Sequence, residues 1–406
     1  MKKLWIILLI VLVGCSNVTV DPETPDVETP VTKKFDRSEV KPLSIDEAFH
    51  EPYLNFVKSS TQALLKEVTS DQNFIYSPMS FYLALAMLEP ITFDESLKEL
   101  YHVLGTESVT EMSQLFHRSL TFENDVGISK VANSLWFQEG LNFNQARLDT
   151  IKKEHLAQGF QVDFRDKTKT METMSQWIDQ QTNNFIKNID LEIDPLTVLA
   201  VINTIYVKDA WLNPFEKAKT INDHFHISAD KHVEVPFMTE NSIDLKYFKN
   251  DQMTVVSKEL ANGGEVLFVL PEGNVDTLVD LEQIHLGPAK VNLKLPKFDV
   301  SSEFGLIEVA KALGLNHILD EFQATIRPFE DDAITVYISK IKQQARLNID
   351  EIGLEAAAYT SIFMEFTSSP RLDEVEVSFD RPFQIILRDR SGLILFVGIV
   401  NNPGLE

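Results

Sequence analysis

Three histidines in the segment "NDHFHISADKHVEV" have the residue type and spacing that could bind a metal ion. His224 and His226 are two positions apart, so in a strand they share one face, and His232 follows close behind. Imidazole nitrogens are common zinc ligands, but a zinc site needs at least three protein donors. The alternative is a solvated or hydrogen-bonded group on a hairpin. We favour that alternative and predict neither a metal nor a cofactor.

Common catalytic motifs are absent from the sequence. It contains no Gly-x-Ser-x-Gly, no phosphate-binding glycine-rich loop with lysine, no His-Glu-x-x-His and no EF-hand loop. The acidic residues are scattered, without a pair whose spacing indicates joint acid–base catalysis. We therefore predict that the protein is not an enzyme, and the sequence argues against a secreted hydrolase.

The first residues are typical of an export signal. Lys2 and Lys3 precede the apolar run 4–13, which is too short to span a bilayer. "LVGC" then resembles a bacterial lipobox, in which Cys15 is acylated after cleavage; an ordinary signal peptide is the alternative. Cys15 is the only cysteine, so lipidation explains an otherwise unpaired thiol. We predict a signal peptide at 1–14 and a lipidated, secreted protein facing outward from the bacterial cell surface or periplasmic side, with the membrane as partner through the anchor.

Composition divides the rest of the chain into two parts. Residues 15–44 are rich in Asp, Glu, Pro and Thr, with little to bury, and are predicted to form a disordered tether. Residues 45–406 have the apolar content of a globular protein and contain neither repeats nor a second linker, so we predict a single domain. With 61 acidic and 37 basic residues the formal net charge is −24, which argues against nucleic acid as a partner.

Hydrophobic periodicity indicates helices mainly in the first half of this domain and strands mainly in the second. Helices are predicted at 46–68, from about 79 after a turn at Ser77-Pro78, at 171–189, and at 304–313 ending at Gly314. Strands are predicted at 128–138, at 196–207 (covered on both faces), and at 334–338, 345–349 and 375–379 among others. This order predicts an α+β fold.

The stretch "LEAAA", Leu354 to Ala358, lies between two of these strands although its residues favour a helix. As a strand, however, the run from Leu354 to Phe366 separates into two distinct faces. The uncharged face has Leu354, Ala356, Ala358, Thr360, Ile362, Met364 and Phe366. The other has Glu355, Ala357, Tyr359, Ser361, Phe363 and Glu365. We therefore predict that this run can enter a sheet with the uncharged face inward.

Successive segments resemble the serpins, a family of metastable protease inhibitors. They are "NFIYSPMSFYLALAML", "KVANSLWFQEGLNFNQ", "INTIYVKDAWLNPFEKAKTINDHFH", "VPFM", "LPKFDVSSEFGLIEVAKALGLNHIL", "ISKIKQQARLNIDEIGLEAAAYT" and "RPFQIILRDRSGLILFVGIVNNP", in the family's order. The resemblance covers nearly all of 45–406. It implies helices packed on three β-sheets with an exposed reactive-centre loop, which inserts into the central sheet after a protease cleaves it.

The resemblance also implies roles for individual residues. The hinge of the loop is implied to be Glu351, Gly353, Leu354, Glu355, Ala356, Ala357, Ala358 and Thr360. The region where the sheet opens is implied to contain Ser77, Ser80, Asn203, Trp211 and Gln343. This chain departs from the family's pattern at Gln343, where a His is common, and at Ile352 and Tyr359. It also departs at Leu354, where a small residue is usual, and this bulk is expected to slow insertion.

The loop length predicts the reactive bond. Counting forward from the hinge gives Thr367-Ser368, with Phe366 and Met364 as alternatives, whereas counting backward from Pro382 gives Arg371. The first bond implies elastase-like or subtilisin-like serine proteases as partners, Phe366 or Met364 chymotrypsin-like ones, and Arg371 trypsin-like ones. We expect a monomeric suicide-substrate inhibitor of extracellular serine, or cysteine, proteases. The alternative is a non-inhibitory serpin that acts as a surface binding or adhesion module.

Overall fold

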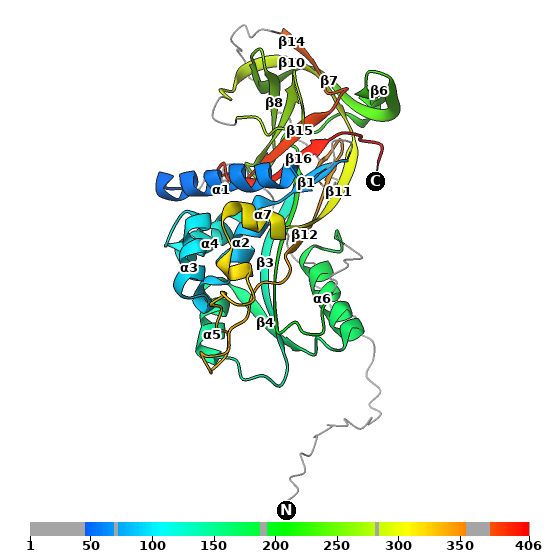
Figure 1. The fold of residues 1–406 in the computed structure, drawn as a ribbon. Coiled ribbons are helices and arrows are strands. Elements are labelled where there is room, and N and C mark those ends of the chain that lie inside the picture. The colour runs from blue at the N-terminus through cyan, green and yellow to red at the C-terminus, as the bar shows by residue number, and fades with distance from the viewer. Residues whose placement is uncertain (1–44, 69–71, 187–192, 281–283, 355–373, 406) are drawn as a thin grey trace, which may run out of the picture. The chain divides into compact units, whose positions relative to one another are not determined.

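The computed structural model describes residues 45–68, 72–186, 193–280, 284–354 and 374–405, the coloured ribbon of Figure 1. The expected signal peptide, Cys15 and the tether lie outside the described residues. So do the hinge positions Glu355 to Thr360 and every candidate for the reactive bond. No helix in the described ranges is both long and apolar enough to cross a membrane.

The helices and strands of the described residues have the following bounds. The α-helices are α1 (Glu47–Leu65), α2 (Pro78–Ala86), α3 (Asp94–Leu104), α4 (Val109–Leu120), α5 (Gln145–Glu154), α6 (Lys167–Gln181) and α7 (Ile307–Leu313), and the 3-10 helices are η2 (Glu89–Ile91), η3 (Lys217–Lys219) and η5 (His317–Leu319). The strands are β1 (Phe74–Tyr76), β2 (Phe122–Glu123), β3 (Gly127–Gln138), β4 (Ala157–Val162), β5 (Leu199–Ala210), β6 (Ile221–Ser228), β7 (Lys231–Lys249), β8 (Met253–Glu259), β9 (Glu265–Pro271), β10 (Gly287–Pro296), β11 (Phe298–Gly305), β12 (Lys342–Ile349), β13 (Gly353–Leu354), β14 (Glu374–Ser378), β15 (Phe383–Arg388) and β16 (Ile394–Val400).

Two helix ends show how local sequence sets these bounds. α2 begins at Pro78 because the Ser77 hydroxyl accepts a hydrogen bond from the Ser80 N–H at 3.2 Å, and proline needs no partner for a missing N–H at the first helical position. α7 ends at Leu313 because Gly314 adopts a φ of 109°, which favours glycine. Both ends lie where the sequence predicted them.

The seven-stranded sheet, called the central sheet below, has the order β11-β12-β13-β5-β3-β2, with β4 parallel to β3. β5 and β3 form a long antiparallel ladder, from Asp209 opposite Gly127 to Leu199 opposite Phe137. Among the described residues, β12 and β5 are joined through the two-residue strand β13 alone. β13, which contains the hinge positions Gly353 and Leu354, therefore lies at the junction between the two halves of this sheet.

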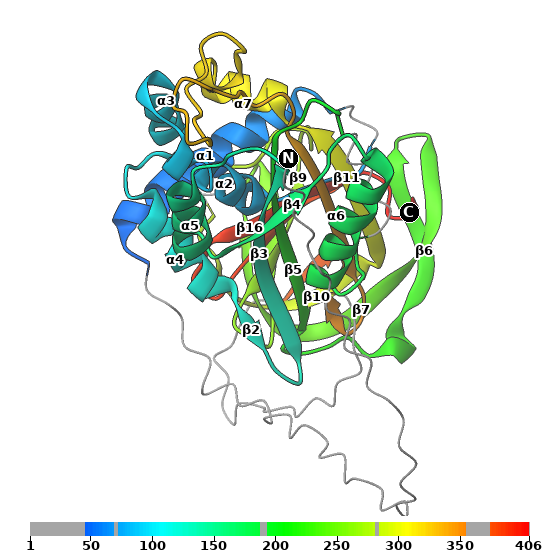
Figure 2. The same ribbon diagram turned by 90° about the horizontal axis from the view of Figure 1, so that it is seen from below.

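Different helices cover the two faces of the central sheet, as Figures 1 and 2 show. α6 lies on one face, the outer face, where Trp177 packs with Trp136 of β3 in a small separate core. α2, α4 and α5 lie on the opposite, inner face. In β5, Ile205 belongs to the large core and Ile202 packs against the small one. The strand is thus covered on both faces as predicted, although residues 199–203 are only half-buried.

The second sheet has nine strands, in the order β1-β16-β15-β9-β8-β7-β10-β14, with β6 beside β7. The long strand β7 pairs with β6 through its first half, with β8 through its last residues, and with β10 along most of its length. Because β7 belongs to both parts, two of the three expected sheets form one continuous hydrogen-bonded sheet here.

Three of the predicted elements differ from the structure. The helix predicted at 304–313 begins only at Ile307, because Phe304 and Gly305 pair with β12 as the end of β11. Residues 334–338 form no strand: Val336 makes a single bridge to Ile326, and the side chains of Ile334 and Tyr337 are 50% and 41% exposed. These residues favour a strand, but among the described residues they have no neighbouring strand with which to pair. The helix predicted at 171–189 ends at Gln181, because Asn183 and Asn184 take positive φ values of 50° and 60°.

Candidate functional site at the hinge and the sheet opening

The hinge strand β13 is already part of the central sheet. Leu354 lies opposite Ile349 of β12 on one side and opposite Asp209 of β5 on the other, and Gly353 lies opposite Ala210. The Leu354 side chain is 1% exposed and belongs to the large core. The inward direction predicted for Leu354 is therefore confirmed, and this bulky side chain is buried within the sheet before any later step.

Glycine is required at position 353 by the close approach of β5. A Cβ atom placed there would lie 2.1 Å from the carbonyl oxygen of Asp209 and 2.8 Å from the Cα of Ala210. Both atoms belong to the backbone of a long ladder, so neither can move aside cheaply. Any larger residue at this position would push the hinge strand away from β5.

The segment that follows β5 holds the backbone just before β13. The Trp211 N–H donates to the Ile352 carbonyl at 2.7 Å, and the indole Nε1–H donates to the Asp350 carbonyl at 2.9 Å. The Phe215 N–H donates to the Glu351 carbonyl at 2.9 Å. Three consecutive carbonyls immediately before β13 are therefore held by one neighbouring segment.

A buried lysine supports this segment from below. The Lys258 side chain is 2% exposed, its Nζ donates to the Asn213 carbonyl at 2.6 Å, and it lies 4.3 Å from the ring centroid of Phe215. Burial lowers the pKa of Lys258 to about 8, although Glu240 acts in the opposite direction. The ammonium thus links the Trp211–Phe215 segment to β8.

Glu351 is the charged residue of the hinge that the structure describes, and it is 4% exposed. Its carboxylate pairs with Lys297 at 2.8 Å and accepts a hydrogen bond from the Thr220 hydroxyl at 2.7 Å. Burial raises the pKa of Glu351, but the hydrogen bonds from Lys297 and Thr220 outweigh it and hold the pKa below its ordinary value. The carboxylate is therefore ionised and paired.

The polar residues predicted at the sheet opening lie together on the inner face. Ser77 and Gln343 exchange two hydrogen bonds of 2.9 Å, from the Ser77 N–H to Gln343 Oε1 and from Gln343 Nε2 to the Ser77 carbonyl. The Ser80 hydroxyl donates to the Asn203 carbonyl at 3.5 Å. Asn203 Nδ2 donates to Asn133 Oδ1 at 2.7 Å, whereas Asn203 Oδ1 is buried without a hydrogen-bond partner. Trp211 lies apart from this cluster, beside the hinge.

Comparison with known proteins shows where this arrangement belongs. The family model for serpins, described as serine protease inhibitors, matches residues 43–403. The chain belongs to the serpin family. It is 29% identical to Serpin A3-8 of Bos taurus over 362 residues (82% of this chain and 84% of the relative) and 28% identical to neuroserpin of Homo sapiens over 369 residues (84% and 88%).

Solved structures of serpins share the fold. Thyroxine-binding globulin in complex with thyroxine matches with a TM-score of 0.76 and 25% identity over 87% of this chain and 98% of that one. The native state of the thermophilic serpin Tengpin matches with a TM-score of 0.76 and 25% identity over 89% and 96%. The predicted α+β serpin fold is therefore confirmed.

The polar cluster of this serpin extends beyond the residues that the sequence indicated. Asn133 Nδ2 lies 2.9 Å from His117 Nε2 and 2.7 Å from the His155 carbonyl, and His155 Nδ1 lies 3.2 Å from the Ser113 hydroxyl. Burial lowers the pKa of both imidazoles to about 4. Asn133, a polar residue inside an apolar strand, carried a sequence signal, but neither histidine stands in a recognisable spacing.

His224, His226 and His232, the three histidines considered as metal ligands, lie on the β6–β7 hairpin. Their rings lie near one another, with centroids 4.4 Å apart for His224 and His232 and 6.3 Å apart for His226 and His232. Across the described ranges, however, no group of three His, Cys, Asp or Glu side chains is placed to hold a metal ion.

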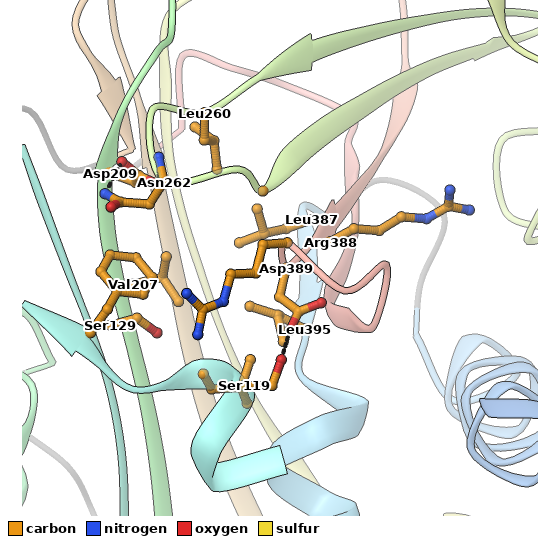
Figure 3. A pocket seen from close by; sticks show the side chains of 14 residues that line it. Ser119, Ser129, Val207, Asp209, Leu260, Asn262, Leu387, Arg388, Asp389 and Leu395 are labelled. Atoms are coloured by element: carbon orange, nitrogen blue, oxygen red, sulfur yellow. Dashed lines mark hydrogen bonds between the residues drawn. The ribbon is translucent and has the colours of Figure 1, made fainter. Parts of the chain in front are cut away.

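A cavity behind the hinge end of β5 is too small for an organic ligand. It measures about 20 Å³ and is lined by residues including Val207, Asp209, Asn262 and Leu395 (Figure 3). The Ser119 hydroxyl donates to the partly buried carboxylate of Asp389 at the lower edge of the cavity. This volume suits about one water molecule.

Replacement of Glu351 by Gln is expected to destabilise the uncleaved serpin by about 1–3 kcal/mol, because Lys297 loses a buried ionic partner. Urea unfolding at neutral pH measures this change. The matched control is Glu303→Gln, which removes a more exposed pair with Lys342 at 2.8 Å and is expected to cost at most about 0.5 kcal/mol. Equal effects of the two substitutions would contradict a special role for the hinge carboxylate.

Proposed function

We propose that this serpin is a suicide-substrate inhibitor of extracellular serine proteases. A target protease attacks the loop between β13 and β14 as it would a substrate and forms an acyl-enzyme. The freed end of the loop then extends β13 into the central sheet, and the attached protease is carried with it before deacylation. Strand addition to an available sheet edge is a known mode of recognition, and serpin loop insertion is one of its cases.

The observation that supports this function best is the position of β13. A two-residue strand already pairs with β5 and β12, so insertion extends an existing strand and does not have to start a new one. Leu354, the departure that argued for a non-inhibitory member, is already buried in the core. Its bulk therefore adds no cost to the steps that follow cleavage.

Continuing the two antiparallel registers predicts the contacts of the inserted strand. Each further residue of the loop moves one position back along β5 and β12, so Thr360 would come opposite Asn203 and Gln343. Directly opposite residues share a face, with Cβ atoms about 5 Å apart. Asn203 Oδ1 is a buried acceptor without a donor, and the Thr360 hydroxyl can supply one. Insertion would thus complete the polar cluster.

The free energy that insertion would release is large enough to move and distort an attached protease. About a dozen new backbone hydrogen bonds at a net of about 1 kcal/mol each give on the order of 10 kcal/mol. This is comparable with the whole stability of a typical domain. The uncleaved form would then be held by a kinetic barrier rather than by its equilibrium stability.

Cleavage of the loop tests the insertion directly. Nicking between residues 360 and 373 is expected to raise the melting temperature by about 20 °C or more, because the inserted strand adds on the order of 10 kcal/mol. Mass spectrometry of the released C-terminal peptide identifies the bond. Cleavage at Thr367-Ser368 or at Phe366 is expected, and this favours elastase-like, subtilisin-like or chymotrypsin-like targets. A nicked chain that melts at the original temperature would favour the binding-module alternative.

Thr360→Val is expected to lower the melting temperature of the nicked form by several degrees, because it removes the donor for Asn203 Oδ1 at a cost of about 1–3 kcal/mol. The uncleaved form should be unaffected. Ser361→Val is the matched control, because position 361 belongs to the opposite face of the inserted strand. If both variants lower the melting temperature equally, the predicted register is wrong.

Lipidation of Cys15 remains a prediction that the described residues leave open. Labelling of the expressed protein with a radioactive fatty acid, compared with Cys15→Ser, measures it.

A further inference from the structure

We propose that Arg346 and Phe185 form a brace across the outer face of the central sheet, and that release of this brace limits the rate at which the cleaved loop inserts. This inference rests on the proposed function, since it concerns the speed of the same insertion. It adds a pair of residues that neither the hinge nor the polar cluster contains.

The brace joins β12 to the connection that follows α6. Arg346 Nη1 donates to the Phe185 carbonyl at 3.0 Å, and the guanidinium carbon lies 4.7 Å from the centroid of the Phe185 ring. One residue therefore meets the same arginine through both its backbone and its side chain. The Phe185 ring in turn packs edge-on against Tyr206 of β5, with centroids 6.0 Å apart. The contact thus links β12 to β5 by way of a third segment.

Arg346 is held firmly in this position by β11. Its Nε donates to Asp299 Oδ1 at 2.8 Å and its Nη2 to Asp299 Oδ2 at 2.5 Å, a bidentate pair. Asn348 Nδ2 donates to the same carboxylate at 3.0 Å. Because Asp299 holds Nε and Nη2 of the guanidinium, the remaining nitrogen, Nη1, is oriented toward the Phe185 carbonyl.

The connection after α6 is also hydrogen-bonded to β3, which lies on the other side of β5 from β12. Lys130 of β3 donates to Asn183 Oδ1 at 3.2 Å, and the Phe185 N–H donates to the Thr182 carbonyl at 2.9 Å. β3 and β12 lie on opposite sides of β5 in the sheet order. Residues 183–185 therefore cross over the outer face of β5 and are fastened at both sides.

This crossing lies on the path of the inserting strand. Continuing the registers of β13 brings position 357 opposite both Tyr206 and Arg346. Tyr206 and Arg346 alternate with the inward residues Ile205, Ala345 and Leu347, so they face outward. Only three residues beyond Leu354, the growing strand would therefore reach the brace.

A closed brace prevents the strand from reaching its place. One end of the cleaved loop stays in the sheet at Leu354, so the strand extends from there between β12 and β5. An added strand moves β12 and β5 apart by about 4.8 Å, and the contact between Arg346 and Phe185, which links them, has to open first. In the inserted strand the small side chain of Ala357 would lie between Tyr206 and Arg346, at the place that the contact crossed.

Two variants test the brace: Arg346→Gln and Phe185→Ala, with Lys342→Gln on the same strand as the matched control. The whole chain is nicked briefly with a protease, which is then inhibited. The heat-resistant fraction is measured over time at a temperature between the two melting temperatures. Each brace variant is expected to acquire heat resistance about tenfold faster than the wild type, which corresponds to about 1.4 kcal/mol of barrier, whereas the control should match the wild type.

The outcomes separate the brace from the proposed function. Unchanged rates in both brace variants, with a wild type that does acquire heat resistance, would overturn the brace and leave the inhibitor function standing. A wild type that acquires heat resistance but traps no protease would remove the inhibitor function, while the measured rates still decide on the brace. A wild type that never acquires heat resistance would overturn both.

Discussion

Gly353→Ala is expected to convert the inhibitor into a substrate. A Cβ atom at this position would lie 2.1 Å from the carbonyl oxygen of Asp209, far inside van der Waals contact, so β13 could not keep its place beside β5. Without β13 the inserting strand loses its starting point, and deacylation would overtake insertion. Covalent complex with the target protease is expected to fall at least tenfold, while cleavage of the loop continues.

Gly305→Ala provides the control for this substitution. Gly305 ends β11 of the same sheet, and a Cβ atom there meets nothing within 4 Å. This variant should form complex as the wild type does. Densitometry of a denaturing gel after reaction with excess protease gives both yields. Full complex formation by Gly353→Ala would mean that the paired state of β13 is not needed for trapping.

Mild acid is expected to destabilise the uncleaved protein through His117 and His155. Burial holds the pKa of each at about 4, whereas an unfolded histidine titrates near 6.5. Above pH 6.5 both states are neutral, and between pH 6.5 and 4 only the unfolded state binds the proton. Stability should therefore fall with decreasing pH, by about 1.4 kcal/mol for each pH unit and each histidine.

Urea unfolding between pH 7 and 5 measures this slope, in a range where most carboxylates stay ionised. The double variant His117→Gln, His155→Gln should have a much flatter profile, whatever its absolute stability. The exposed His102 provides the control substitution, His102→Gln. The hydrogen bond to Glu99 raises the pKa of His317, so protonation of His317 stabilises the folded state as the pH falls. His317 is present in every variant, so its contribution is the same in all of them. An equally steep profile in the double variant would contradict the assignment.

The sequence predicted the direction of the hinge residues but not their location in the sheet. Strand alternation placed Leu354 on the inward face, and its burial in the core agrees. That Leu354 pairs with both Ile349 and Asp209 depends on contacts between segments far apart in the chain, and period-two alternation carries no information about partners. The same limit explains the error at 334–338, where strand-forming residues have only one bridging partner.

The polar residues of the site were likewise only partly predictable from the sequence. Ser77, Ser80, Asn203 and Gln343 could be named because family resemblance covers them, and the structure brings them together. His117 and His155 lie on or beside helices whose polar and apolar pattern is ordinary, so no spacing set them apart. Arg346 and Phe185 meet only because the connection after α6 crosses β5, which is a property of the folded chain.

Trapping of a protease by a covalent bond is the central claim, and one incubation tests it. The protein is mixed with elastase, subtilisin, chymotrypsin and trypsin in turn, boiled in detergent and run on a denaturing gel. We predict a band at the summed mass of the chain and the protease, less the released C-terminal peptide, for at least one of the first three enzymes. Clean cleavage by every enzyme without such a band would contradict the account and identify the chain as a substrate only.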